Sequence, residues 1–139
     1  HVIINKRAST WLVRVDSSTT VTITSMDGAT ALGTSKVVSA TSITTSVAID
    51  ADITDIHLVT AQAGAILYSN PTGTLFEGQK LIILIKDNAT ARAITWGANF
   101  RAMGTALPTT TVVSKWKKLG FMYSVTDTKW DLLAAADEA

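Results

Sequence analysis

The stretch GQKLIILIKDNATARAITW, residues 78–96, decides the fold of this chain. Its centre, residues 81–85, is the strongest apolar run in the sequence and is rich in β-branched residues, which fit a pleated strand. Asp87 and Asn88 end the run, and an apolar pattern resumes toward Trp96. This order predicts a central hairpin: a strand, a tight turn and a second strand. A strand that is apolar on both faces needs cover on both, inside a sandwich or against a neighbouring subunit.

The other apolar segments are short and are separated by turn signals. Residues 21–25 alternate strictly, and residues 56–60, 117–124 and 129–134 also have strand patterns. A loop is predicted over residues 69–73, where a proline and a glycine lie close together. No stretch has helical periodicity. We therefore expect an all-β fold, an antiparallel β-sandwich, of which the jelly roll is one form.

The length and patterning bound the domain organisation. A chain of 139 residues is one compact domain by default. An internal boundary, if there is one, falls in the weakly patterned residues 29–35. We accordingly separate an N-terminal β segment, residues 1–35, from a β-sandwich module, residues 36–139. The first segment is expected to serve attachment or contact between subunits.

The composition limits the class of protein. Hydrophobic residues make up 47% of the chain and charged residues only 17%, against about a quarter in ordinary proteins. Either a secreted or virion surface or an oligomer that hides part of its surface explains this balance. The net charge of +1 gives no reason to expect nucleic acid as a partner. The chain has no cysteine, which excludes disulfides and thiolate metal sites, and no apolar run approaches the about 20 residues of a membrane span.

Two clusters are candidate binding sites. Asp50, Asp52 and Asp55 form the one close group of carboxylates, and a D-x-D bend can bind calcium through oxygen ligands. Because aspartates also cap turns with their side chains, turn formation is the alternative. The second cluster, which could bind a receptor or an anionic glycan, places cations beside an aromatic ring and comprises Lys115, Trp116, Lys117 and Lys118. Its alternative is a solvated strand end, because alternation sends neighbouring side chains to opposite faces.

The remaining aromatic and titratable residues give no catalytic motif. Trp11, Trp96 and Trp130 lie in apolar contexts and are expected in the core or at subunit contacts. His57 is expected to be hydrogen-bonded on the polar face of a strand. The sequence contains no G-x-S-x-G, no H-E-x-x-H and no phosphate-binding loop. An enzyme is therefore not expected, and no cofactor is predicted.

From about Val37 to Ala136 the chain resembles a C-terminal module of bacteriophage tail-fibre and virion appendage proteins. The resemblance rests on the order and spacing of these blocks: DADITD (50–55), PTG (71–73), EGQKLII (77–83), KDNATARAITW (86–96), LPTTT (107–111), GFMY (120–123) and TDTKWDLL (126–133). The family usually has neutral residues where this chain has Trp116 and Lys117, which makes that segment particular to this protein. The resemblance implies a structural component of the virion surface, homotrimeric and without enzymatic activity.

These observations leave three functions open. The leading one is a structural module of a phage virion: a fibre tip, a tail appendage or a capsid decoration, in contact with other virion proteins. The alternative is a carbohydrate-binding β-sandwich that recognises a bacterial surface glycan through Trp116. A polysaccharide-degrading enzyme is the third. Low charge and an apolar central strand also predict an oligomer, because large exposed apolar patches are rare on monomers. At least one of Trp11, Trp96 and Trp130 is expected at or near its interface.

Overall fold

The computed structural model describes residues 2–7, 10–15 and 35–139. The chain forms two compact units, His1–Ser35 and Lys36–Ala139. In the first unit, β1 (Val2–Arg7) pairs antiparallel with β2 (Thr10–Val15), which contains Trp11. The strand predicted at residues 21–25 lies outside the described residues. Within the described ranges, no helix is long and apolar enough to span a membrane.

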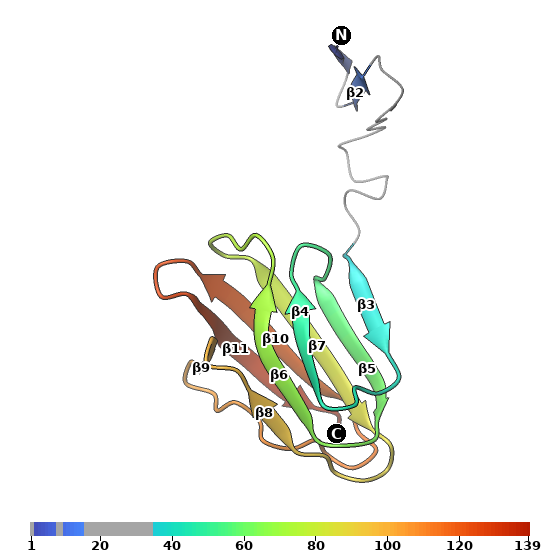
Figure 1. Ribbon diagram of the computed structural model, residues 1–139, viewed down its shortest axis with the longest axis vertical. Coiled ribbons are helices and arrows are strands. Elements are labelled where there is room, and N and C mark those ends of the chain that lie inside the picture. Colours follow the sequence, from blue (N-terminus) through green and yellow to red (C-terminus); the bar gives the residue numbers. More distant parts are fainter. Residues whose placement is uncertain (1, 8–9, 16–34) are drawn as a thin grey trace. The chain divides into compact units, whose positions relative to one another are not determined.

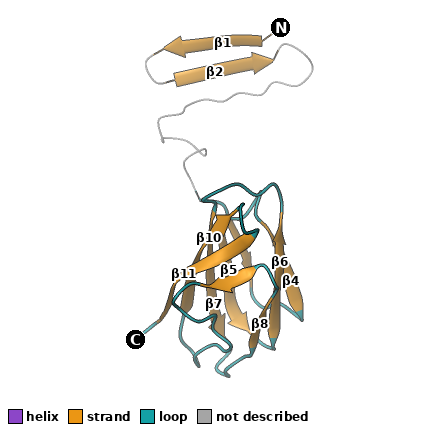
Figure 2. Cartoon of the chain, turned by 90° about the vertical axis from the view of Figure 1, so that its left-hand side faces the viewer, coloured by secondary structure: helices purple, strands orange, loops and turns teal. Residues whose placement is uncertain are grey.

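The second unit is all-β, as the sequence predicts, and consists of two sheets that lie as two layers (Figures 1 and 2). The larger sheet has the order β3-β5-β7-β10-β11-β9 and the smaller has the order β4-β6-β8. The strands are β3 (Val37–Ala40), β4 (Ser46–Asp50), β5 (Ile56–Gln62), β6 (Ile66–Thr72), β7 (Lys80–Asp87), β8 (Ile94–Trp96), β9 (Phe100–Ala102), β10 (Lys117–Ser124) and β11 (Lys129–Asp137).

The chain alternates between the two sheets from β3 to β9, so that strands adjacent in one sheet are every second strand in the sequence. As a result β3 and β7 both pair parallel with β5, and β4 and β8 both pair parallel with β6. Among the strands of the second unit, only β10 pairs antiparallel with its neighbours, β7 and β11, whereas β9 joins β11 in parallel. The prediction of an antiparallel sandwich, with the jelly roll as one form, is therefore wrong in its strand pairing: the larger sheet is mixed and the smaller one is parallel.

The predicted central hairpin is also not formed, because its two strands lie in different sheets. Strand β7 pairs with β5 and β10, and β8 pairs with β6. The carboxylate of Asp87 accepts hydrogen bonds from the backbone N–H of Ala89 (3.0 Å) and Ser114 (2.8 Å) and from the Thr111 hydroxyl (2.7 Å). These bonds stabilise the segment after β7 as a connection that crosses from one sheet to the other, in place of a two-residue hairpin turn.

The predicted loop at residues 69–73 is strand for most of its length, since β6 continues through Pro71 to Thr72. Strand β8 pairs with β6 only as far as Tyr68, and beyond it β6 is paired through Thr72 to β4 alone. On the side of β6 that faced β8, Pro71 has no neighbouring strand. Its missing N–H donor therefore costs no hydrogen bond between strands there. Gly73, with φ of 111°, follows the strand end.

The core fills the space between the two sheets. Along β7 the side chains of Leu81, Ile83 and Ile85 are completely buried, as alternation requires of one strand face. An aromatic cluster joins the sheets: the Trp96 ring stacks on Tyr68 at 5.0 Å and meets Phe100 at 5.0 Å edge to face. The other buried apolar residues are Ile49, Ala51, Val59, Ile66, Ile94, Leu119, Phe121, Tyr123, Trp130 and Leu132.

The opposite face of β7 is not covered by other residues of the second unit. Ile82 is 41% exposed and Leu84 is half-buried, so the expected second cover is absent from this unit. The strand register places Ile82 beside Ile56 of β5 and Val37 of β3, and Leu84 beside Leu58. We call Val37, Ile56, Leu58, Ile82 and Leu84 the outer aliphatic face.

Candidate functional site

Strand β10 separates the four residues of the predicted cationic cluster. Lys117 points inward with 6% exposure and donates a hydrogen bond to the carboxylate of Asp137 on β11. Lys118 follows it on the exposed outer face, and Trp116 lies half-buried just before the strand. Lys115 belongs to the preceding turn. Strand alternation therefore separates Lys117 from the cluster, as the alternative to a binding patch predicts, but Trp116 and Lys118 remain on the same side of the strand.

Trp116 and Lys118 line a pocket at the start of β10 and the end of β11. Its other lining residues are Ala136, Asp137 and Glu138, and its volume is about 350 Å³. This volume lies at the small end of the range for ligand sites. A second hollow of about 260 Å³, beside β6 and β8, has no charged residue in its lining. The first pocket is therefore the better candidate for a functional site.

Two residues that contact Trp116 come from parts of the sequence that the prediction did not connect with it. The ammonium of Lys86, from the end of β7, lies 5.9 Å from the centre of the Trp116 ring, within range of a cation–π contact. The backbone N–H of Trp116 donates to the Glu138 carboxylate (3.0 Å), and the Glu138 N–H donates to the Trp116 carbonyl (2.8 Å). Both contacts join segments distant in sequence, so no local signal marks them.

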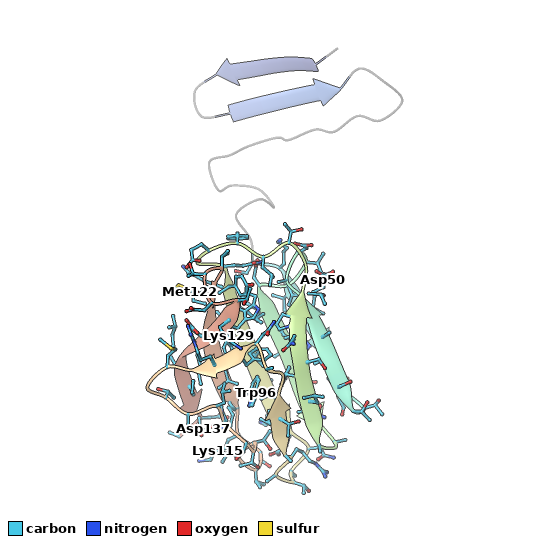
Figure 3. The ribbon with its side chains drawn as sticks, turned by 60° about the vertical axis from the view of Figure 1, so that its left-hand side comes forward. Asp50, Trp96, Lys115, Met122, Lys129 and Asp137 are labelled. Atoms are coloured by element: carbon cyan, nitrogen blue, oxygen red, sulfur yellow. The ribbon has the colours of Figure 1, made fainter. Side chains whose placement is uncertain are left out.

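The three aspartates of the candidate calcium site form hydrogen bonds to backbone N–H groups. Asp50 accepts from the N–H of Asp52 (3.0 Å), Asp52 from that of Thr74 (2.9 Å), and Asp55 from that of Lys36 (2.8 Å). Within the described part of the chain, no three His, Cys, Asp or Glu side chains gather in a way that could hold a metal ion. Turn capping is thus the role seen here. Asp50 also lies at the end of the sandwich opposite Lys115 and Asp137 (Figure 3).

His57 faces the core instead of the polar face of its strand, because its register partner Ile83 is an inward residue. Its ring meets that of Tyr68 edge to face at 5.8 Å, and its Nδ1 is buried without a hydrogen-bond partner. Burial lowers the pKa of His57, which favours the neutral imidazole. The pKa of Tyr68 is raised for the same reason, so neither group carries charge in the core near neutral pH.

The tryptophans differ in placement. Trp130 is completely buried within the second unit, and Trp96 is half-buried and donates through Nε1 to the Pro108 carbonyl at 2.7 Å. Both therefore belong to the core, which is one of the two placements predicted for them, the other being a subunit contact. Trp11 lies on β2, in the first unit.

Comparison of the chain with protein-family models, with curated proteins and with solved structures found no significant match.

Proposed function

We propose that this chain is a structural component of a bacteriophage virion, exposed on the particle surface as a fibre tip, a tail appendage or a capsid decoration. It acts as a homotrimer, contacts other virion proteins and has no enzymatic activity. The resemblance of residues 37–136 to phage appendage modules supports the virion role. The N-terminal unit, His1–Ser35, supplies attachment to the particle or contact with the next subunit.

The outer aliphatic face is the observation that carries the proposal. No residue of the second unit covers Ile82, although it lies on a central strand of the larger sheet, and Val37 at the sheet edge is 56% exposed. Burying such a row against a second copy removes apolar area from water and protects the open edge of β3. Cyclic symmetry lets each copy cover the next, and the family resemblance selects three copies.

Light scattering on the full chain tests the trimer. We expect a trimer mass for the wild type at micromolar concentration and a monomer mass for Ile82→Asp, because a carboxylate cannot be buried unpaired in an apolar interface. Leu67→Asp is the matched control, since Leu67 is 38% exposed on the smaller sheet and should leave the trimer intact. A monomer mass for the wild type would contradict the proposed trimer. A trimer mass for the Ile82→Asp variant would show that the interface does not include Ile82.

The second candidate function is recognition of a bacterial surface glycan, and the pocket at Trp116 favours it. A half-buried aromatic ring that lines a pocket, beside lysines without a partner among the described residues, is suited to a sugar that carries negative charge. The two functions are compatible, because a fibre tip can also bind its receptor. A glycan array on the isolated chain separates them: a clean negative favours assembly or decoration, and a hit favours recognition.

A further inference from the structure

The charges around the Trp116 pocket are not balanced. Of the two acidic side chains in the lining, Asp137 pairs with Lys117, whereas Glu138 accepts from the neutral N–H of Trp116 and has no cationic partner among the described residues. By contrast, the ammonium groups of Lys86 and Lys118 have no hydrogen-bond or ion-pair partner among the described residues. Around the Trp116 ring, two lysines, Lys86 and Lys118, and one carboxylate, Glu138, are therefore without an oppositely charged partner among the described residues, which leaves an excess of positive charge.

The aromatic ring adds a second requirement. Trp116 lines the pocket with an apolar ring, and Ala136 leaves room opposite the start of β10. A small inorganic anion would satisfy the lysines but leave the ring without a partner. A neutral sugar would cover the ring but leave the ammonium groups unpaired. A sugar ring that bears an anionic group satisfies both.

We propose that this pocket binds an acidic glycan through a sugar unit that carries a carboxylate or a phosphate. Lys118 pairs with the anionic group, the Trp116 ring packs against the sugar ring, and Lys86 holds the indole and adds positive potential. The Glu138 carboxylate accepts from sugar hydroxyls with its remaining lone pairs. This inference rests on the host-recognition part of the proposed function. Lys118 lies beside Leu84 in the sheet register, at the border of the outer aliphatic face, so the trimer must leave Lys118 accessible.

Calorimetric titration of the full chain tests the proposal with three probes. These are a tetrasaccharide containing glucuronic acid, a hexose 6-phosphate and a neutral glucose tetrasaccharide. We expect binding of one or both acidic probes and none of the neutral one at about 10 mM, the weak end of specific affinities. The two acidic arms distinguish a carboxylate from a phosphate as the source of the charge.

Single substitutions locate the site. Lys118→Gln should weaken binding of the acidic probe about tenfold, the effect of losing one charge-assisted hydrogen bond. Trp116→Leu should weaken it by a similar factor. Lys80→Gln is the matched control, since Lys80 is also an exposed lysine on the outer side of the larger sheet but lies outside the pocket lining. It should change affinity by less than about twofold.

Three results would overturn the inference: no binding of either acidic probe, equal binding of the neutral probe, or an equal loss in Lys80→Gln and Lys118→Gln. The last result would mean unspecific attraction to the surface. Light scattering on the same samples measures the oligomer mass, so that failure of sugar binding can be distinguished from failure of the proposed structural role. A trimer that binds no acidic sugar leaves the structural role intact, and a monomer that binds one supports the recognition role alone.

Discussion

The ammonium of Lys117 lies on the inner face of the larger sheet and donates to the carboxylate of Asp137 on the neighbouring strand. The side chain of Lys117 is 8% exposed and that of Asp137 is 41% exposed, so the pair joins a buried cation to a partly solvated anion. A buried charge is tolerated only when it is paired, because its hydration is lost. The pair thus stabilises the end of β11 against β10, next to the Trp116 pocket.

Removal of Asp137 should therefore destabilise the fold. We expect Asp137→Ala to lower the free energy of unfolding by about 1–2 kcal/mol, less than for a fully buried pair because water screens the carboxylate. Lys117→Met keeps the buried stem and removes the charge, so it should cost less than Asp137→Ala. The double variant should recover most of the loss, which chemical denaturation of all four proteins measures as a coupling. Additive losses would show that the pair contributes nothing.

The buried face of β7 gives the second prediction. Ile83→Ala or Ile85→Ala should each lower the free energy of unfolding by about 2–5 kcal/mol, because each leaves a cavity between the sheets. Ile53→Ala is the matched control: Ile53 is 58% exposed, and its change should stay within about 0.5 kcal/mol. Denaturant unfolding measures all three. A loss below about 0.5 kcal/mol at Ile83 would contradict its complete burial.

Strand positions follow from the sequence because they depend on local alternation. The pattern over residues 117–124 predicts the strand that is found there, and the apolar run at residues 81–85 predicts the centre of β7. Pairing does not follow, since a period of two residues fixes the face of each side chain but not the neighbouring strand. The hairpin prediction failed for this reason: a polar crossing after Asp87 has the same local composition as a turn.

In the candidate site, too, local sequence predicts some features, whereas others depend on which strands are neighbours. Local sequence marks Trp116 and Lys118, and alternation alone explains why Lys117 turns inward. The acid that pairs with Lys117 and the second cation at the indole ring come from β11 and β7, and only the sheet order brings them there. For His57 the local pattern was misleading, because a polar residue between two apolar ones is normally on the exposed face.

Gly97 gives the third prediction, because the chain passes Asn70 too closely there for any side chain. A Cβ at Gly97 would lie 2.4 Å from Asn70 Oδ1 and 2.7 Å from its backbone nitrogen. Asn70 Oδ1 accepts from the N–H of Asn99, and the Gly97 N–H donates to the Tyr68 carbonyl at 2.7 Å. We expect Gly97→Ala to lower the free energy of unfolding by about 1–3 kcal/mol, as overpacking does.

Gly64→Ala is the control for this change, since a Cβ at Gly64 meets nothing within 4 Å. Its free energy of unfolding should stay within about 1 kcal/mol of the wild type, or rise slightly because the unfolded chain loses freedom. Thermal or denaturant unfolding measures both variants. Equal effects at the two glycines would mean that Asn70 can move away without loss.

The last prediction concerns Asp87 and pH. Burial by itself would raise the pKa of this carboxyl, but hydrogen bonds from the Ser114 N–H, the Thr111 hydroxyl and the Ala89 N–H, with attraction to Arg92, outweigh it and leave the pKa below its usual value of 3.8. Because the folded protein prefers the charged form, Asp87 stabilises the fold above the ordinary aspartate pKa. That stabilisation is lost as the pH falls through the lowered pKa.

Asp87→Asn should accordingly be less stable than the wild type by about 1–3 kcal/mol at pH 7, the range for hydrogen bonds to a charged group. The difference should shrink steadily from about pH 4 downward, as the wild type loses its advantage. Thr111→Val removes one donor and should give an intermediate loss with the same direction of pH dependence. Unfolding curves from about pH 2 to pH 7 measure the effect. Parallel curves for wild type and Asp87→Asn over that whole range would show that the carboxylate bonds do not favour the charged form.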